Sequence, residues 1–361
     1  MYIYESNNWP NFLWDKDYIS NKLLLLNKDA GYLIGRLSDI GFDIRLKVMR
    51  DVVTDDVVDS YAIEGINLNE EEVRSSVAKK LGVEAPAEKD SSHYIDGIVE
   101  VMLDATNNYN IPLTEKRLFN WHTMLFPNNA RDIIIGAYRQ TGMKVISGMM
   151  GREKIHYIAP QPTDIAPMMK DFLSFFNQKQ DVTTYLKSAI AHLWFVSIHP
   201  FDDGNGRMAR AISDMALSQA DNSKMRFFSI SKQINIEKKY YYHILERTQK
   251  SNGDLTEWID WYLSCMQHAI ARSNDLLSLI LKKSLFYKRY SDKTLSNRQK
   301  EVLNIYLDGY EGLLTVKNWA KLSNVSQDTA MRDIKDLVDK HILIPQNNEK
   351  RNVKYNINIE D

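Results

Sequence analysis

Several features that decide a protein's class are scarce or missing in this chain of 361 residues. Its single cysteine, Cys265, excludes an internal disulfide and predicts a reducing, cytoplasmic setting. No apolar run approaches the roughly 18–20 residues needed to cross a bilayer, so we expect no membrane partner. The first residues, MYIYESNNWPNFLWDKDYIS, lack a basic start followed by an apolar stretch, so we expect no signal peptide.

An excess of charge of one sign is also missing. With 46 basic and 47 acidic side chains the formal net charge is −1, so no whole-protein field would attract nucleic acid or anionic lipid. Helix breakers are sparse, at 15 Gly and 9 Pro, and helical patterns are abundant. Together with a hydrophobic fraction of 44%, this predicts a mostly α, globular protein of two or three domains.

What the chain does contain is a dense run of chemically active residues, HPFDDGNGRMAR, at positions 199–210. Apolar helical patterns precede it over Tyr185–Ile198 and follow it over Arg207–Gln219. The run is therefore a loop that leads into the start of a second helix.

The glycines and arginines of this loop suit phosphate. Gly204 and Gly206 can take positive φ and Asn205 tolerates it, so successive backbone N–H groups can converge on an anion. The positive end of the following helix points into the same space. Arg207 offers a planar fork for phosphate, and Arg210 lies one turn further along the same face.

A base and a metal ligand complete the set. His199 is a candidate general base near neutral pH, and Asp203 is a hard oxygen ligand placed to share Mg²⁺ with phosphate oxygens. Each feature alone has a plainer explanation, as a structural histidine, a turn or a solvated salt-bridge cluster. Their joint spacing favours phosphoryl or nucleotidyl transfer.

The run matches the Fic-domain motif H-P-F-x-[DE]-G-N-G-R-x-x-R at every specified position. The chain therefore resembles the Fic family, most of whose members transfer AMP from ATP to a hydroxyl of a target protein and release pyrophosphate. The resemblance implies a helical Fic fold with a small β-hairpin flap, ATP and a protein target as partners, and Mg²⁺ as the metal. It implies that His199 is the base, that Asp203 binds Mg²⁺, that Gly204, Asn205 and Gly206 cradle phosphate, that Arg207 stabilises the leaving β-phosphate, and that Arg210 holds the γ-phosphate.

A helical pattern upstream ends in the sequence SYAIEG at residues 60–65. Ser60 and Glu64 share a face, and Gly65 is a natural helix stop, so the stretch by itself is an ordinary helix end. It resembles, however, the inhibitory motif [ST]-x-x-x-E-[GN] that precedes the Fic motif in one subgroup. The resemblance implies that Glu64 pairs with Arg210 and blocks the productive pose of the ATP γ-phosphate.

Two short β-prone runs, Met143–Ser147 and Ile155–Ile158, predict a hairpin. Its plain role is to cap one end of a helical bundle. In the Fic family the matching region, also followed by a tyrosine and a proline as in HYIAPQP here, is the flap over the active site. A strand edge there can hold a target segment through backbone hydrogen bonds. The flap residues implied are Lys144, Val145, Ile146 and Ile158.

Residues 238–250, KKYYYHILERTQK, predict a helix with three adjacent tyrosines. Neighbouring residues on a helix point apart, so at most two can face a site, and core packing is their ordinary role. The pattern Tyr-Tyr-x-x-Leu-Glu resembles the Fic segment near the adenine. This resemblance implies that Tyr241 and Tyr242 contribute to ATP binding.

The remaining patterns outline the rest of the chain. His122 is expected to be a packed core histidine, and Asn69 and Thr114 are expected to cap helices. The aromatic segment 1–20 is expected to pack on the main body, and residues 83–91 to form a surface loop. Further helices are predicted over residues 17–37, 44–63, 91–105, 114–125, 163–177 and 256–287.

The last part of the chain predicts a winged helix-turn-helix. Helices near 296–307, 316–322 and 326–340 are followed by a β-ribbon over 342–344 and 353–359, which is the order of that fold. Residues 291–361 carry 11 basic and 11 acidic side chains, and the expected recognition helix contains the acidic residues Asp328, Asp333, Asp336 and Asp339. A DNA-reading helix should be basic, so protein docking is favoured, although DNA stays open.

The sequence thus divides into an N-terminal helical region carrying the inhibitory motif (1–90), a Fic catalytic core (91–287) and a winged helix (288–361). The resemblance to the Fic family implies an autoinhibited protein adenylyltransferase that acts on Tyr, Thr or Ser hydroxyls of a target and of itself. Transfer of another phosphate-linked group, removal of AMP, and a DNA-binding regulator with a nucleotide-sensing core remain alternatives. A homodimer and the signal that releases Glu64 stay undecided.

Overall fold

The computed structural model describes residues 1–38, 40–83, 91–127, 133–148, 152, 154–178, 184–346 and 353–359. They form two compact units, Met1–Ser273 and Asn274–Asp361, whose boundary falls within helix α11 (Thr256–Arg289). The expected surface loop at 83–91 and the hairpin connection at 148–153 lie largely outside the described residues. The domain boundaries expected at 90/91 and 287/288 stay predictions.

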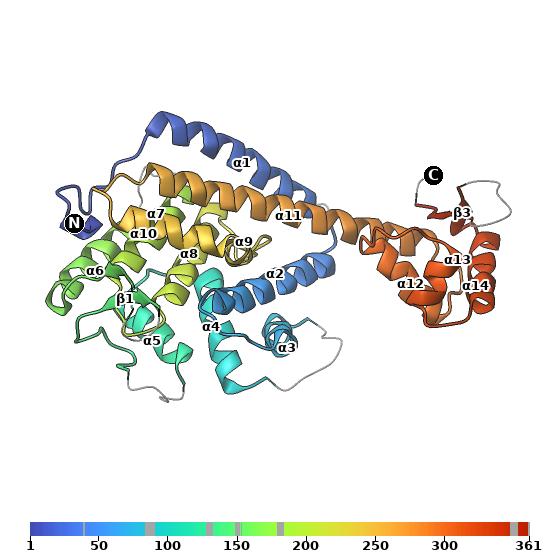
Figure 1. Cartoon of the computed structure of the whole chain (residues 1–361), viewed down its shortest axis with the longest axis horizontal. Helices are drawn as coiled ribbons and strands as arrows, with labels where there is room; N and C mark the ends of the chain where they lie inside the picture. Colours follow the sequence, from blue (N-terminus) through green and yellow to red (C-terminus); the bar gives the residue numbers. More distant parts are fainter. Residues whose placement is uncertain are drawn as a thin grey trace. The chain divides into compact units, whose positions relative to one another are not determined.

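The protein is mostly helical, which confirms the predicted fold class (Figure 1). No helix of the described part of the chain is long and apolar enough to cross a membrane. The helices of the first unit, besides α11, are η1 (Ile3–Glu5), α1 (Lys16–Ser38), α2 (Phe42–Ile63), α3 (Glu70–Leu81), α4 (His93–Asn107), α5 (Glu115–Leu125), α6 (Pro162–Asn177), α7 (Thr184–Ile198), α8 (Asn205–Asp221), α9 (Ile230–Ile236) and α10 (Lys238–Gln249).

Helices α7 and α8 form the centre of the first unit and pack against each other. Helix α7 is apolar on nearly all sides, from Tyr185 to Ile198, as expected of a helix surrounded by others. Helix α8 is buried over its first fourteen residues except Gly206. Helices α4, α5 and α2 pack against α8, and α6 packs against α7. The loop between α7 and α8 therefore starts and ends in the rigid core.

The predicted helix starts at Asn69 and Thr114 are confirmed. The Asn69 side chain accepts hydrogen bonds from the backbone N–H groups of Glu71 and Glu72, and the Thr114 hydroxyl accepts one from Arg117. Helix α9 was not predicted from the sequence.

The predicted hairpin is present as strands β1 (Lys144–Ser147) and β2 (Lys154–Ile158), which pair antiparallel. A β-bulge lies between Val145 and Ile146. Tyr157 is buried, and its hydroxyl donates to the backbone oxygen of Ser197 near the end of α7 at 2.6 Å. The hairpin is therefore attached to the core beside the central loop.

The aromatic N-terminal segment packs on the main body, as predicted. The ring of Tyr2 meets that of Tyr157 edge-on at 5.1 Å between centroids. Trp9 and Phe12 pack edge-on against Trp194 of α7, at 5.8 and 5.3 Å.

The second unit contains α12 (Asn297–Leu307), α13 (Val316–Leu322), α14 (Gln327–Asp339), β3 (Leu343–Pro345) and β4 (Tyr355–Ile357). Strands β3 and β4 pair antiparallel, and Leu314 makes a bridge to Tyr355 on β4. A core built around Trp319, Leu303 and Leu337 holds these elements together. The element order matches the sequence expectation, and the winged-helix assignment itself stays a prediction.

Candidate active site

The loop between α7 and α8 is closed by the side chain of Asn205. Its Oδ1 accepts from the backbone N–H of Phe201 at 3.0 Å, and its Nδ2 donates to the Phe201 oxygen at 2.8 Å. Gly204 has φ of +82°, and a Cβ there would lie 3.0 Å from the Phe126 ring, so glycine is required at this turn. Because the side-chain amide of Asn205 is engaged with Phe201, the backbone N–H of Asn205 is the group that can contribute to a phosphate cradle.

His199 lies at the start of this loop in a strained conformation, with φ of +51°. Its Nδ1 lies 3.2 Å from the backbone oxygen of Val196 and donates the hydrogen bond, which leaves a lone pair on Nε2. Burial, assisted by the charge of Arg139, lowers the pKa of His199 to about 4, against the opposing effects of the hydrogen bond to Val196 and the charges of Glu64 and Asp203. The ring is therefore neutral at pH 7, with one nitrogen able to accept a proton.

Arg139 holds the backbone at His199 in place, although no role was predicted for it from the sequence. Its buried guanidinium donates to the oxygens of His199 (2.8 Å), Thr141 (2.7 Å) and Pro160 (2.6 Å). Its own N–H donates to the Pro200 oxygen at 3.0 Å. The residue lies in the run GAYR at 136–139, and no signal within one sequence distinguishes it from a surface arginine.

His122 is a buried, packed histidine, as predicted, and it also holds the loop. Its Nδ1 accepts from the Gly136 N–H, and its Nε2 donates to the backbone oxygen of Asp203, both at 3.1 Å. The ring stacks on Phe201 at 4.2 Å between centroids. Burial lowers the pKa of His122, so the neutral tautomer that these two bonds require is the stable one.

Asp203 and Arg207 lie together at the first turn of α8. Nη2 of Arg207 donates to Oδ1 of Asp203 at 3.1 Å, and the guanidinium packs over the Phe126 and Tyr61 rings at 4.8 and 5.0 Å. The Asp203 side chain is one-third exposed, at 33%. No group of three or more His, Cys, Asp or Glu side chains among the described residues could hold a metal alone. An ion at Asp203 would take further ligands from phosphate oxygens.

Arg210 is fully buried, and it binds the end of α2. Its Nε donates to Ser60 Oγ at 2.7 Å, and its Nη2 donates to the Ser60 oxygen at 2.7 Å and to Glu64 Oε1 at 2.8 Å. Its Nη1 is buried without an acceptor in the described part of the chain. The Glu64 carboxylate also lies against Gly206, where a Cβ would overlap Oε1, so only glycine permits this approach. A carboxylate thus occupies the start of α8.

The last turn of α2 is also bound by α10. Tyr242 donates through its hydroxyl to the Ile63 oxygen, and Lys238 donates to the Ala62 oxygen, both at 2.9 Å. Gly65 then ends the helix with φ of +78°. Tyr242 is half-buried, whereas Tyr241 is buried with its hydroxyl 3.1 Å from His192 Nε2.

The predicted flap residues lie on the β1–β2 hairpin. Arg139 connects the root of this hairpin to the His199 loop through hydrogen bonds. Lys144, Val145 and Ile146 on β1 are exposed, and Ile158 on β2 is partly buried. The structure therefore brings the predicted base, cradle, arginines, inhibitory residues and the root of the flap into one region of the first unit.

Comparison with known proteins agrees with this geometry. Residues 112–217 match the model of the Fic/DOC family, and residues 2–83 match a family described as a domain of unknown function, DUF4172. Residues 112–217, which include the flap and the His199 loop, are therefore a domain of the Fic/DOC family.

The chain is similar to proteins named "Protein adenylyltransferase Fic". It is 26% identical over 215 residues to that of Drosophila melanogaster and 25% identical over 221 residues to that of Aedes aegypti. In both cases the match covers 58% of this chain and 40% of the relative, so the chain spans about two fifths of the length of these relatives.

Solved structures share the fold. A Fic family protein from Desulfovibrio desulfuricans has a TM-score of 0.55 at 18% identity, covering 94% of this chain and 97% of its own. A Fic-domain signaling protein from Bacteroides thetaiotaomicron has a TM-score of 0.52 at 17% identity, covering 69% of this chain and 97% of its own. At these identities the likeness establishes the fold alone.

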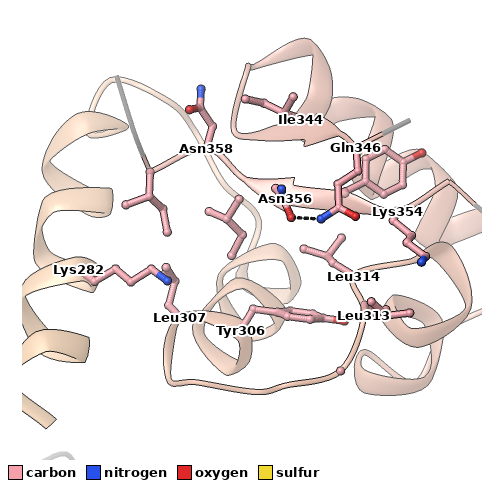
Figure 2. Close-up of a pocket in the computed structure, with 14 residues that line it drawn as sticks. Lys282, Tyr306, Leu307, Leu313, Leu314, Ile344, Gln346, Lys354, Asn356 and Asn358 are labelled. Atoms are coloured by element: carbon pink, nitrogen blue, oxygen red, sulfur yellow. Dashed lines mark hydrogen bonds between the residues drawn. The ribbon is translucent and has the colours of Figure 1, made fainter. Parts of the chain in front are cut away.

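The second unit has a cavity of about 600 Å³ of its own (Figure 2). Apolar side chains such as Leu313 and Ile344 form part of it, and Lys282 and Lys354 are its charged residues. The amides of Gln346, Asn356 and Asn358 add hydrogen-bonding groups, so its lining combines apolar surface with positive charge.

Proposed function

We propose that the chain is a protein adenylyltransferase, which transfers AMP from ATP to a Tyr, Thr or Ser hydroxyl of a target protein and of itself. We propose further that Glu64 inhibits it. The observation that carries the proposal is the arrangement at the start of α8, where a neutral histidine, a glycine-lined loop and two arginines meet and a glutamate lies on one of the arginines.

In the proposed reaction, Nε2 of His199 takes the proton of the target hydroxyl, whose oxygen attacks the α-phosphorus of ATP as pyrophosphate leaves. Backbone N–H groups of Gly204, Asn205 and Gly206 and the positive end of α8 hold phosphate oxygens. Arg207 stabilises negative charge on the leaving β-phosphate. Asp203 would hold Mg²⁺, which when bound would neutralise part of the negative charge on the phosphates.

Inhibition follows from competition between two anions for Arg210. The γ-phosphate would accept from the guanidinium that now donates to Glu64, and the two negative charges would repel each other at close range. The unpaired Nη1 of Arg210 adds a donor for a phosphate oxygen. ATP therefore binds productively only when Glu64 has moved.

The two tyrosines of α10 contribute differently in this proposal. Tyr242, 42% exposed and bonded to the end of α2, offers its ring to the adenine. Tyr241 is buried, so it acts by supporting its neighbour, with their ring centroids 5.1 Å apart.

The target segment would add to the flap as an extended strand beside Lys144, Val145 and Ile146, with backbone hydrogen bonds for affinity. The second unit would dock a protein rather than DNA. Its equal numbers of acidic and basic side chains, 11 each over residues 291–361, support this.

The experiment that tests the proposal is intact-mass spectrometry of the Glu64→Gly variant with ATP, Mg²⁺ and a cell lysate. The expected result is AMP on the variant and on at least one lysate protein. Thermal-shift ranking of ATP, UTP, CDP-choline and GTP separates transfer of other phosphate-linked groups. Release of AMP from a modified target, with no transfer from ATP, would replace the proposal by the reverse reaction.

A further inference from the structure

One edge of the β-ribbon in the second unit is only partly paired. The N–H of Asn358, next to β4, donates to the oxygen of Ile342, next to β3, at 2.9 Å. Since backbone polar groups point alternately to the two edges of a strand, those of Tyr355 and Ile357 point away from β3. On that far edge the Tyr355 N–H donates to the Leu314 oxygen at 2.9 Å. No backbone hydrogen bond reaches Ile357 on the same edge within the described residues, so the edge is open there.

The open edge borders the cavity of about 600 Å³, which Leu314, Tyr355 and Ile357 help to line (Figure 2). Two large apolar side chains of the lining, Leu313 and Ile344, are 54% and 47% exposed. The volume lies within the range of roughly 300–1,000 Å³ that is usual for ligand-binding pockets. An extended segment in this cavity would therefore bond to the backbone of Ile357 and cover apolar surface at the same time.

The charged residues of the lining are two exposed lysines, Lys282 and Lys354. Figure 2 shows them on opposite sides of the cavity, Lys282 on α11 and Lys354 next to β4. Neither forms an ion pair with a described residue, whereas the neighbouring Lys283 pairs with Asp308 at 2.9 Å. The cavity therefore presents two uncompensated positive charges to an occupant.

These features together select a peptide as the occupant. Its backbone supplies the N–H and carbonyl groups that an open strand edge needs, and its side chains can supply both carboxylates and apolar surface. The amides of Gln346 and Asn356, which are bonded to each other, keep an oxygen and N–H groups for further contacts. Nucleic acid would also bring negative charge to the lysines, but it has neither a strand backbone nor apolar side chains for Leu313 and Ile344.

We propose that the cavity of the second unit binds an extended, acidic segment of a partner protein. The segment adds as a strand to β4 at Ile357, buries an apolar side chain against Leu313 and Ile344, and places carboxylates at Lys282 and Lys354. This inference rests on the protein docking proposed for the second unit, and it does not depend on AMP transfer.

The test is fluorescence anisotropy of the chain of 361 residues with a labelled synthetic peptide. The peptide has two glutamates at each end and alternating threonine and leucine between them. We expect saturable binding that Lys282→Glu and Lys354→Glu each weaken about threefold to tenfold, because each change turns an attraction into a repulsion. Leu313→Ser should weaken it about fivefold through lost apolar burial.

The matched control is Lys335→Glu, the same charge reversal on an exposed lysine of α14 outside the cavity, and it should leave the affinity unchanged. All four variants should keep the melting temperature of the parent, since the side chains that they change are exposed. No saturable binding, equal binding of a peptide with lysines in place of the glutamates, or equal losses in Lys335→Glu and Lys282→Glu would overturn the proposal.

A second measurement changes only the peptide. N-methylation of every other peptide N–H removes the donors of one edge of the added strand, so one of the two alternating methylation patterns should abolish binding and the other should be tolerated. Equal tolerance of both patterns would overturn strand addition.

The outcome is separable from that of the proposed enzymatic function. Lys282→Glu should not change the rate of self-modification of the Glu64→Gly variant with ATP and Mg²⁺. Failure of the peptide to bind while AMP transfer occurs would overturn this inference alone, and peptide binding without AMP transfer would overturn the adenylyltransferase alone. Binding of duplex DNA that is lost in Lys282→Glu, with no binding of the peptide, would replace the protein segment by nucleic acid. A dimer of the chain that Lys282→Glu dissociates, again without peptide binding, would make a second copy the occupant.

Discussion

At the scale of single residues, Arg210 donates hydrogen bonds to two residues of α2 and its C-cap, Ser60 and Glu64. Ser60 receives two of its hydrogen bonds, through its hydroxyl and its backbone oxygen, and Glu64 receives one. Removal of Glu64 therefore leaves the guanidinium in place and frees one of its donors for an anion. The Glu64 side chain is 32% exposed, so water can replace its contact with Arg210 when it leaves.

We predict that Glu64→Gly raises the initial rate of self-modification by about 10- to 100-fold, the effect of one charge-assisted hydrogen bond of roughly 1.5–3 kcal/mol. Intact-mass spectrometry over time measures this rate. The control is Glu70→Gly at the first turn of α3, where the carboxylate pairs with Arg74. A rate equal to that of the parent would show that Glu64 does not inhibit.

We predict that His199→Ala, in the Glu64→Gly background, lowers the transfer rate by about 10²- to 10⁴-fold, because loss of a general base has effects of that size. Incorporation of labelled ATP measures the rate. The melting temperature should change little, since the ring makes one hydrogen bond, to the Val196 oxygen. Undiminished incorporation would mean that another group takes the proton.

The pH dependence of the reaction follows from the burial of His199. Burial disfavours the imidazolium and lowers its pKa to about 4, so the base form persists above that pH. We predict that kcat/KM of the Glu64→Gly variant is flat between about pH 6 and 8 and falls as pH drops towards 4. Glu64 is one of the charges that raise this pKa, so its removal shifts the fall no higher. A midpoint near 6.5 would contradict a buried ring.

At the scale of elements, the middle of α2 is anchored to α9 and its last turn is held mainly by backbone oxygens. Asp55 pairs with Lys232 at 2.8 Å, Asp56 accepts from Ser229 at 2.5 Å, and Asp59 accepts from Asn235 at 2.7 Å. The release of Glu64 that the proposed activation requires could therefore be confined to the final turn, with these contacts of α2 retained.

Arg139 joins two other elements, the root of the flap and the loop of His199. We predict that Arg139→Met lowers kcat of the Glu64→Gly variant by roughly 10²-fold, because a catalytic group displaced by about 1 Å costs that much. It should also cost about 3 kcal/mol of stability, roughly 1 kcal/mol for each of the three hydrogen bonds that the guanidinium donates. Thermal unfolding and single-turnover rates measure the two effects. Arg139→Lys should recover part of the stability, and an unchanged kcat in the Met variant would contradict a positioning role.

At the scale of the whole molecule, the charge of the second unit bears on whether its partner is DNA or a protein. Asp333 on α14 is buried and forms two hydrogen bonds of 2.7 Å with Arg298. Asp336 pairs with Lys340 at 2.6 Å. Two of the four acids of the expected recognition helix thus have structural partners, and they cancel basic charge that DNA would need.

We predict that the chain of 361 residues binds duplex DNA no more tightly than the non-specific range of about 10⁻⁴–10⁻⁶ M at physiological salt. Fluorescence anisotropy at several salt concentrations measures the affinity. A protein that makes 6–10 phosphate contacts loses about 10³–10⁵ in affinity between 50 and 200 mM salt. We expect the slope of log K against log salt for this chain to be much shallower than that. A steep slope with tighter binding would favour the DNA-binding alternative.

Much of this architecture was predictable from local patterns. The long helices, the caps at Asn69 and Thr114 and the hairpin follow from periodicity and turn chemistry. Helix α9, seven residues long, was missed, although α13, of the same length, was predicted. Arg139 and the role of His122 were missed because both act through backbone oxygens distant in sequence, which no residue pattern records.

The sequence by itself determined the chemistry of residues 199–210, because a glycine's access to positive φ and the types of side chain at each position are local properties. Only the tertiary structure determined which distant side chains contact these residues and how deeply they are buried. It brings the Glu64 carboxylate into contact with Arg210, 146 residues away in the sequence, and lowers the pKa of His199 by burial. Proximity and desolvation depend on how distant segments pack, and packing is a property of the folded chain as a whole.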